Sequence, residues 1–120
     1  MESRSSASQG SLGAVLYAAR QARRLTLRQV AASVGVTFAY IADLERDRRT
    51  PSEATAAALS ACLGVDVDQI MAHTGRLRES VAAYLRQQPE AGRLLGRIAE
   101  RQLSGPRLEQ LLAEVDRLPG

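Results

Sequence analysis

The stretch from Thr26 to Glu45 constrains the fold of this chain most strongly, because it carries the pattern of a short helix that ends at a glycine. Thr26 precedes Gln29 by three residues. This spacing is typical of a capping box, in which the Thr hydroxyl and the Gln side chain each accept a hydrogen bond from a backbone amide of the first turn. We therefore predict a helix that begins near Leu27. Its inward stripe follows helical spacing and comprises Leu27, Val30, Ala31 and Val34.

A second short helix is predicted directly after Gly35. Glycine enters the left-handed backbone region at no steric cost, so Gly35 can end the first helix. Thr37 can then cap the second helix. The inward stripe of this helix is Tyr40, Ile41 and Leu44, and the residues that point elsewhere are Phe38, Ala39, Ala42 and Asp43. Two helices joined by a tight glycine turn are the layout of a DNA-reading helix-turn-helix.

Basic charge is concentrated on this part of the chain. The net charge is only +3, and all 16 basic residues are arginines. Between Arg20 and Thr50, seven arginines stand against three acidic residues. Phe38, the only phenylalanine, is predicted to be at least half exposed beside them. Arginine binds phosphates through a planar fork and stacks on bases, so this composition suits a nucleic-acid partner, although a codon bias toward arginine explains the absence of lysine equally well.

The flanking sequence predicts three further helices around this pair. The first covers residues 12–23. Thr50, or Ser52 in its place, caps a helix that ends at Gly64. Asp66 caps a short helix after it. The buried stripe of the first helix is Leu12, Val15, Leu16 and Ala19, and the last short helix contributes Ile70 and Met71. The expected fold class is therefore all-α.

From about Leu12 to about Ala72, the sequence resembles the lambda-repressor-like helix-turn-helix family of transcriptional regulators, also called the XRE family. The resemblance is carried by Leu25-Thr-Leu-Arg-Gln-Val-Ala, Gly35-Val-Thr, Tyr40-Ile-Ala-Asp-Leu-Glu-Arg, Arg49-Thr-Pro-Ser and Leu59-Ser-Ala-Cys-Leu-Gly-Val. It implies a five-helix domain over residues 12–75 that binds double-stranded DNA, most often as a repressor. Asp47 departs from the family, whose members often carry glycine there, and Asp tolerates the left-handed conformation less well than glycine.

The resemblance also implies roles for individual residues. Base edges would be contacted by Thr37, Phe38, Ala39 and Asp43. Phe38 and Ala39 suit a thymine methyl, and Asp43 can accept a hydrogen bond from a cytosine amino group. Phosphates would be contacted by Arg24, Thr26, Arg28, Tyr40, Arg46, Arg48 and Arg49. Each arginine has the alternative of a solvated surface charge. A family ion pair that links the first helix to the end of the third matches Arg20 and Glu45.

Beyond Gly75 the apolar pattern predicts three weaker helices, at 77–87, from 89 to about 103, and at 106–118. A piece of about 40 residues lies near the limit for independent folding. We therefore predict that residues 76–120 form a dimerisation or regulatory segment; the alternative is that they fold back on the first domain. The predicted dimer residues are Val81, Leu85, Leu94, Leu95, Ile98, Leu108, Leu111, Leu112 and Val115. A homodimer would read a palindrome with half-sites about one helical turn apart.

Residues 1–11 are rich in serine and lack the apolar centre of a signal peptide, so we expect them to form a disordered arm. The sequence contains no run of about 18 apolar residues, the length that a membrane-spanning helix needs. The single cysteine rules out an internal disulfide and favours a reducing compartment. These features predict a cytoplasmic protein.

No group of residues predicts catalysis, a metal site or a cofactor. Cys62 and His73 are each the only residue of their type, and neither has a second ligand at metal-site spacing. The absence of lysine excludes repressors that cleave themselves with a serine and lysine dyad as a template. The alternative to a transcriptional regulator is an antitoxin or protein-binding module, whose C-terminal helices bind a partner and whose DNA binding serves autoregulation. The tail also has a weak likeness to small family regulators whose dimerisation tail is cleaved by a metallopeptidase, so a peptidase or a toxin is the expected regulatory partner.

Overall fold

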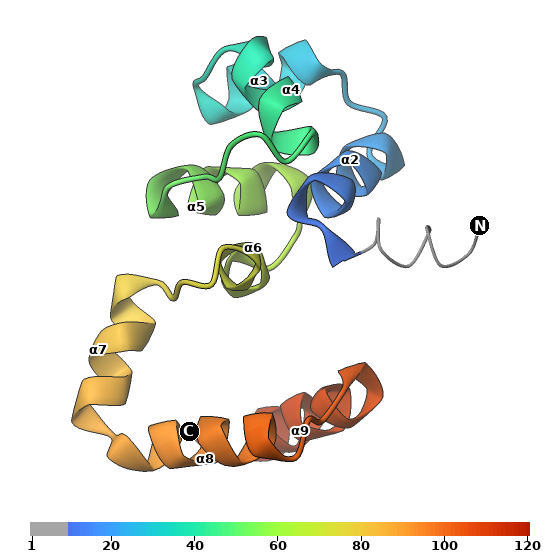
Figure 1. The fold of residues 1–120 in the computed structure, drawn as a ribbon. Helices are drawn as coiled ribbons and strands as arrows, with labels where there is room; N and C mark the ends of the chain where they lie inside the picture. Colours follow the sequence, from blue (N-terminus) through green and yellow to red (C-terminus); the bar gives the residue numbers. More distant parts are fainter. Residues whose placement is uncertain (1–9) are drawn as a thin grey trace. The chain divides into compact units, whose positions relative to one another are not determined.

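The computed structural model describes residues 10–120, which form helices joined by turns (Figure 1). The chain divides into two compact units, one that ends at Arg78 and one that covers Glu79–Gly120. The division therefore falls slightly after the boundary near Gly75 expected from the sequence. Residues 1–9 of the expected arm lie outside the described residues. Ser11 does not belong to an arm, because it is the N-cap of the first described helix.

Within residues 10–78, the first unit contains the five helices that the sequence predicts. They are α2 (Leu12–Ala22), α3 (Leu27–Val34), α4 (Phe38–Glu45), α5 (Glu53–Leu63) and α6 (Val67–His73). Each begins with a side chain that accepts a hydrogen bond from an amide of its own first turn. The capping residues are Ser11, Thr26, Thr37, Ser52 and Asp66. Ser52, and not Thr50, therefore caps α5.

The five helices enclose one hydrophobic core. Its buried residues are Leu12, Leu16, Val30, Ala31, Ile41, Leu44, Ala56, Leu59, Leu63, Ile70 and Met71. Ala19, Tyr40 and Cys62 are partly buried and pack against this core. The helix-turn-helix pair therefore does not stand alone, because α4 packs on both α2 and α3 through side chains such as Ile41 and Leu44. Burial of each such aliphatic side chain stabilises the fold by about 1.5–3 kcal/mol.

An arginine that sequence reasoning left unassigned joins the ends of two helices in this unit. The Arg23 Nε atom donates a hydrogen bond of 2.9 Å to the Leu63 carbonyl at the end of α5. Gly64 follows in the left-handed conformation, with φ 77°. A Cβ at this position would collide with the Arg23 guanidinium. The backbone conformation of Gly64 therefore calls for glycine, and any other side chain would also displace the Arg23 guanidinium.

The second unit consists of α7 (Glu79–Gln87), α8 (Pro89–Glu100) and α9 (Gly105–Arg117). Within residues 79–120 no side chain of these helices is fully buried. The unit thus carries helices without a closed core. No helix of residues 10–120 is long and apolar enough to span a membrane.

The ends of these helices differ from the sequence prediction for local reasons. Residues 76–78 do not belong to α7, since Arg76 donates to the Pro51 carbonyl at 2.6 Å and Arg78 forms an ion pair with Asp68 in the first unit. The α8 helix ends at Glu100 instead of near Leu103, and Gln102 then adopts a left-handed φ of 53°. The α9 helix ends before Leu118, which precedes a proline and is extended.

Candidate nucleic-acid interface

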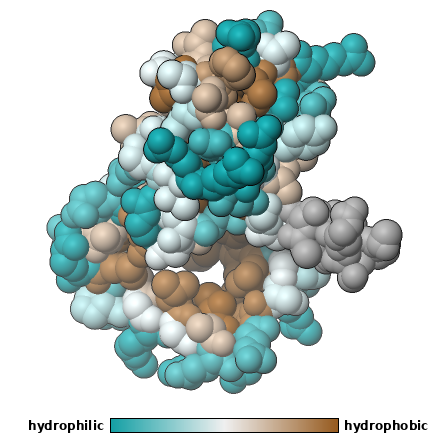
Figure 2. Space-filling model, turned by 45° about the horizontal axis from the view of Figure 1, so that its top comes forward, coloured by the Kyte–Doolittle hydropathy of each residue, from teal (hydrophilic) through white to brown (hydrophobic). Residues whose placement is uncertain are grey.

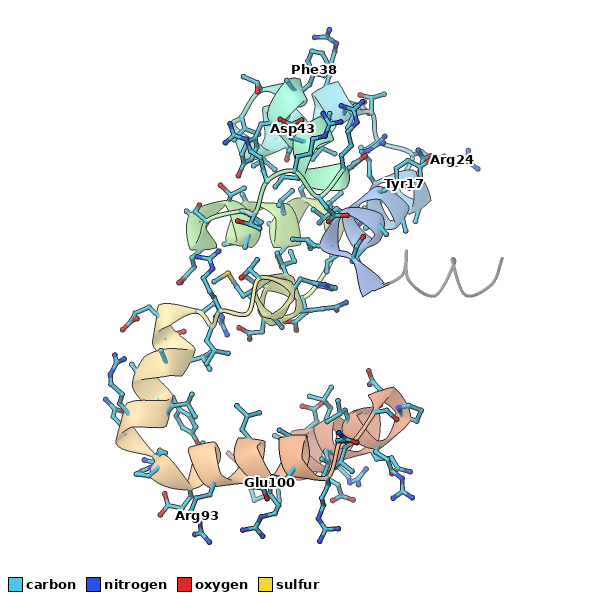
Figure 3. All side chains as sticks on the ribbon, viewed as in Figure 1. Tyr17, Arg24, Phe38, Asp43, Arg93 and Glu100 are labelled. Carbon is cyan, nitrogen blue, oxygen red and sulfur yellow. The ribbon has the colours of Figure 1, made fainter. Side chains whose placement is uncertain are left out.

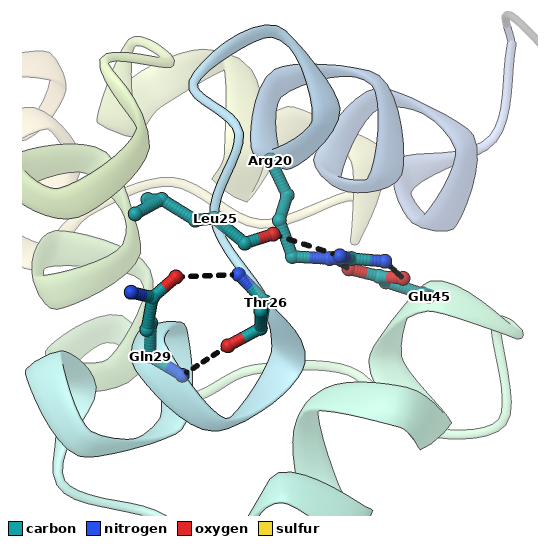
Figure 4. Close-up of polar contacts among 5 residues, drawn as sticks. All are labelled: Arg20, Leu25, Thr26, Gln29 and Glu45. Atoms are coloured by element: carbon teal, nitrogen blue, oxygen red, sulfur yellow. Dashed lines mark hydrogen bonds and ion pairs between the residues drawn. The ribbon is translucent and has the colours of Figure 1, made fainter.

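Hydrogen bonds fix both ends of α3 and the start of α4. The Thr26 amide donates to Gln29 Oε1 at 2.8 Å, and the Gln29 amide donates to Thr26 Oγ1 at 3.0 Å, so the predicted capping box is present (Figure 4). Gly35 ends α3 with φ 88°. No atom lies near the position of a Cβ on Gly35, so its backbone conformation, not space, calls for glycine. Thr37 then accepts the Tyr40 amide at 3.1 Å and starts α4.

A nearly buried ion pair holds the other end of α4. Arg20 donates from Nε to Glu45 Oε2 at 2.6 Å and from Nη2 to Oε1 at 3.0 Å, while Nη1 donates to the Leu25 carbonyl at 2.9 Å (Figure 4). Both side chains are only 11% exposed. The hydrogen bonds to Glu45 raise the pKa of Arg20, so the guanidinium stays charged. One arginine therefore joins α2, the loop before α3 and the end of α4.

Asp47 supplies a second link between α4 and α2. It adopts the left-handed conformation, with φ 60°, that a glycine would take at this position. Its Oδ1 atom accepts a hydrogen bond of 2.8 Å from the Gly13 amide in the first turn of α2. A Cβ on Gly13 would collide with the Glu45 carbonyl. The departure from the family glycine therefore keeps the loop geometry and adds a carboxylate at the amino end of α2.

The outward face of α4 begins with Phe38, which is 42% exposed. Ala39 is also exposed, and Ala42 and Asp43 are half-exposed. Figure 3 shows Phe38 and Asp43 on the α4 part of the domain, away from α6. Ile41 and Leu44 point the opposite way, into the core. The structure thus places all four predicted base-contact residues, Thr37 included, at the start of α4 or on its accessible side.

Two of the predicted phosphate-binding arginines stack on aromatic rings. The Arg28 guanidinium carbon lies 4.3 Å from the centroid of the Phe38 ring. The Arg49 guanidinium carbon lies 5.2 Å from the centroid of the Tyr40 ring, and its Nε atom is 4.0 Å from Asp43 Oδ2. Tyr40 is half-buried and packs against the core, as expected. The first stack joins α3 to α4, and the second joins the loop after α4 to the helix itself.

Part of the chain is similar in sequence to known proteins. Residues 16–70 match the family model described as helix-turn-helix. The chain is 36% identical over 73 residues to the immunity repressor protein of Bacillus phage phi105, an alignment that covers 61% of this chain. It covers 51% of the phage protein, so the chain spans about half the length of this relative. Residues 16–70 therefore resemble helix-turn-helix domains of other proteins in sequence.

Two solved structures are also similar to the chain. The clp gene regulator ClgR from Corynebacterium glutamicum is 28% identical, with a TM-score of 0.47, and the match covers 70% of this chain and 85% of ClgR. A SinR protein/SinI protein complex contains a chain that is 22% identical, with a TM-score of 0.49, and the match covers 88% of this chain and 94% of that one.

The remaining predicted phosphate contacts lie in two places: Arg24 and Thr26 precede α3, and Arg46 and Arg48 follow α4. Arg24, Arg46 and Arg48 are exposed and form no ion pair with another residue of the described range 10–120. An open groove of about 740 Å³ runs past the amino end of α3. It is lined by Arg20, Gln21, Arg24, Leu25, Thr26, Leu27, Arg28 and Phe38. Three predicted phosphate contacts and one predicted base contact therefore share one groove.

Sequence reasoning missed Gly13 and Tyr17 in the helix-turn-helix domain. Gly13 allows the first turn of α2 to approach the end of α4, and a glycine in the first turn of an amphipathic helix was the available signal. Tyr17 is 50% exposed, and the Arg20 guanidinium carbon lies 5.4 Å from its ring centroid (Figure 3). It lines an open hollow of about 890 Å³ together with Ala42 and Arg46. Tyr17 thus belongs to the same surface as the outward face of α4.

Proposed function

We propose that this chain is a sequence-specific DNA-binding transcriptional repressor that reads a palindromic operator as a homodimer. One observation supports this proposal above the others: a helix-turn-helix domain whose second helix is held at both ends and presents an exposed face flanked by arginines. Thr37 holds its start and the Arg20–Glu45 pair holds its end. Such a helix can enter the major groove without a change in its own packing. The immunity repressor with 36% identity supports repression as the outcome.

The reading face divides into base contacts and phosphate contacts. Phe38 and Ala39 would contact thymine methyl groups, Asp43 would accept from a cytosine amino group, and Thr37 would bond a base edge at the start of the helix. Phosphates would be bound by Arg24, Thr26, Tyr40, Arg46, Arg48 and Arg49. The free amides in the first turn of α3 would donate hydrogen bonds to a DNA phosphate bound in the groove beside Thr26.

The second unit supplies the proposed homodimer contact. Figure 2 shows apolar residues gathered on the C-terminal helices in the lower part of the view. Among the predicted dimer residues, Val81, Leu85, Ile98 and Leu108 are half-buried. The exposed ones are Leu94, Leu95, Leu111, Leu112 and Val115. A second copy would bury these side chains and would place two reading domains on one operator.

Selection of bound fragments from genomic DNA, followed by titration of the selected site, tests the function. We expect a palindrome bound in preference to unrelated DNA of the same length. Arg48→Ala should weaken binding to all sequences and lower the slope of log affinity against log salt by about one. Arg93→Ala is the matched control, because it removes one positive charge from an exposed position of α8 (Figure 3). It should change neither the affinity for DNA nor the salt slope. Equal binding of the wild-type protein to all duplexes would contradict the proposal.

The same apolar surface favours one second candidate. In that case the C-terminal helices bind a partner protein, such as a toxin or a peptidase, and DNA binding only regulates the gene itself. A chain that stays monomeric when purified alone, and that forms a stable complex with the product of an adjacent gene, would favour this candidate. Either function places the protein in the cytoplasm with the DNA, without a membrane.

A further inference from the structure

The outward face of α4 offers few hydrogen-bond donors, and the Thr37 hydroxyl at its start supplies one O–H. Phe38, Ala39 and Ala42 have no polar side-chain atom, and an ionised Asp43 only accepts hydrogen bonds. A guanine, however, presents two acceptors, N7 and O6, in the major groove. The single Thr37 hydroxyl can donate to only one of these two acceptors at a time. A side chain that donates to both N7 and O6 has to come from a neighbouring element.

Arg28 is a two-donor side chain that lies beside the start of α4. It is the second residue of α3, and its guanidinium carbon lies 4.3 Å from the centroid of the Phe38 ring. A guanidinium that stacks on a ring keeps its N–H groups at the edge of its plane, where they can reach an acceptor. The stack also restricts the side chain before any ligand binds. No carboxylate among residues 10–120 forms an ion pair with Arg28.

Arg49 does not offer the same arrangement. Its guanidinium carbon is farther from a ring, at 5.2 Å from the Tyr40 centroid. Its Nε atom also lies 4.0 Å from the Asp43 carboxylate, which draws it along α4. Phe38, which supports Arg28, is in turn the residue best placed for a thymine methyl. The Phe38 ring and the Arg28 guanidinium therefore form one composite reading element at the start of α4.

We propose that Arg28 recognises a guanine by donating two hydrogen bonds to O6 and N7, while the edge of the Phe38 ring contacts the methyl group of an adjacent thymine. Each operator half-site then contains a guanine next to a thymine, read by α3 and α4 together. This inference rests on the proposed function. It replaces the phosphate contact that the sequence predicted for Arg28 with a base contact.

Site-specific replacement of guanine by 7-deazaguanine tests the inference, because it removes the N7 acceptor and leaves the phosphates unchanged. In the selected operator, each guanine that is present in every selected site is replaced in turn. At one of them the wild-type protein should lose about 5-fold to 100-fold in affinity. Arg28→Ala should show no further loss at that guanine. Arg28→Lys should retain the salt dependence of the wild type but weaken the preference for guanine there, because lysine lacks the planar fork that stacks on the ring.

The opposite results would overturn the inference. They are equal sensitivity of wild type and Arg28→Ala to every replaced guanine, together with a fall of about one in the salt slope for Arg28→Ala, as a phosphate contact requires. A selected operator without any invariant guanine would also overturn it. Phe38→Leu keeps an apolar contact but removes the ring face, so it should reduce the sensitivity at the same guanine; unchanged sensitivity would overturn the supporting role of the ring. Binding without any sequence preference by the wild type would contradict the proposed function instead.

Discussion

The two units of this chain have similar helices but differ in what those helices enclose. In the first unit, α2 packs on α4, α3 on α4 and α5, and α5 on α6, so that their apolar stripes meet in one core. In the second unit α7 packs on α8, and no side chain of residues 79–120 is fully buried. The caps differ in the same way. Each helix from α2 to α6 has a capping side chain, whereas α8 and α9 begin at residues without such a hydrogen bond.

This difference shows that an amphipathic helix stabilises a domain only when its stripe has a partner. The apolar stripes of α8 and α9 include Leu94 and Leu112, two residues that are 58% and 56% exposed. Large exposed apolar patches usually mark interaction surfaces. The first unit is therefore expected to be stable by itself, and the second to gain its stability from association.

The largest difference should appear on truncation of a leucine in each unit. Leu44 has no exposed surface, so Leu44→Ala should lower the free energy of unfolding by about 4 kcal/mol through lost burial and a cavity. Leu112→Ala should leave the unfolding of the first unit unchanged and weaken self-association. Chemical denaturation and sedimentation equilibrium measure the two effects. A Leu112→Ala protein whose first unit unfolds as easily as that of Leu44→Ala would contradict the division of roles.

The next effect should come from the ion pairs. Arg20→Ala leaves Glu45 nearly buried and unpaired, which should lower the free energy of unfolding by about 3 kcal/mol. The matched pair in the second unit is Arg117 with Glu114, whose side chains are 64% and 67% exposed. Arg117→Ala should therefore leave the unfolding curve in place, because solvent screens such a pair. Chemical denaturation measures both variants. If both substitutions shift the midpoint of the denaturation curve equally, the anchoring role of Arg20 is wrong.

A smaller loss is expected at Asp47. Asp47→Ala removes the acceptor for the Gly13 amide and keeps a left-handed φ, so it should lower the free energy of unfolding by about 1–2 kcal/mol. Asp47→Gly also loses the acceptor but relieves the backbone, and it should fall between Ala and the wild type. Asp116→Ala, on α9, is the control without such a contact. Thermal unfolding monitored by circular dichroism ranks the variants, and an Asp47→Gly protein that is less stable than Asp47→Ala would refute this assignment.

The smallest effect on the free energy of unfolding should come from the residues that precede α3 and α8. Thr26→Ala opens the capping box of α3 and should lower the free energy of unfolding by about 1 kcal/mol. Gln88 precedes α8 without a side-chain cap, so Gln88→Ala should have no effect on unfolding. Denaturant titration resolves the two. A loss from Gln88→Ala as large as that from Thr26→Ala would show that α8 is capped after all.

Local signals made most of the first unit predictable. The Thr26 and Gln29 spacing, Gly35, Thr37 and Asp66 each act within one helical turn, and the helices begin and end close to where these residues predict. The Arg20–Glu45 pair was implied by family likeness and not by spacing, since 25 residues separate the two.

Contacts between distant elements could not be predicted in the same way. The approach of Gly13 to Glu45 and the reach of Arg23 to Leu63 depend on how the helices cross. The Arg28–Phe38 stack likewise depends on the angle between α3 and α4. In the second unit, periodicity predicted the helices, and the small size of the segment predicted that its apolar stripes need a partner. The surface that covers them could not be predicted, because it depends on contacts between distant elements.

The affinity of the full chain for its selected palindrome, compared with that of a chain that ends at Arg78, tests the central claim most directly. The first unit has its own core, so the shortened chain should fold and bind a single half-site as well as the full chain does. On the palindrome it should bind at least about 100-fold more weakly, because it binds the two half-sites without the linkage between copies. Equal affinity of both chains for the palindrome would contradict the assignment of the second unit as the dimer contact.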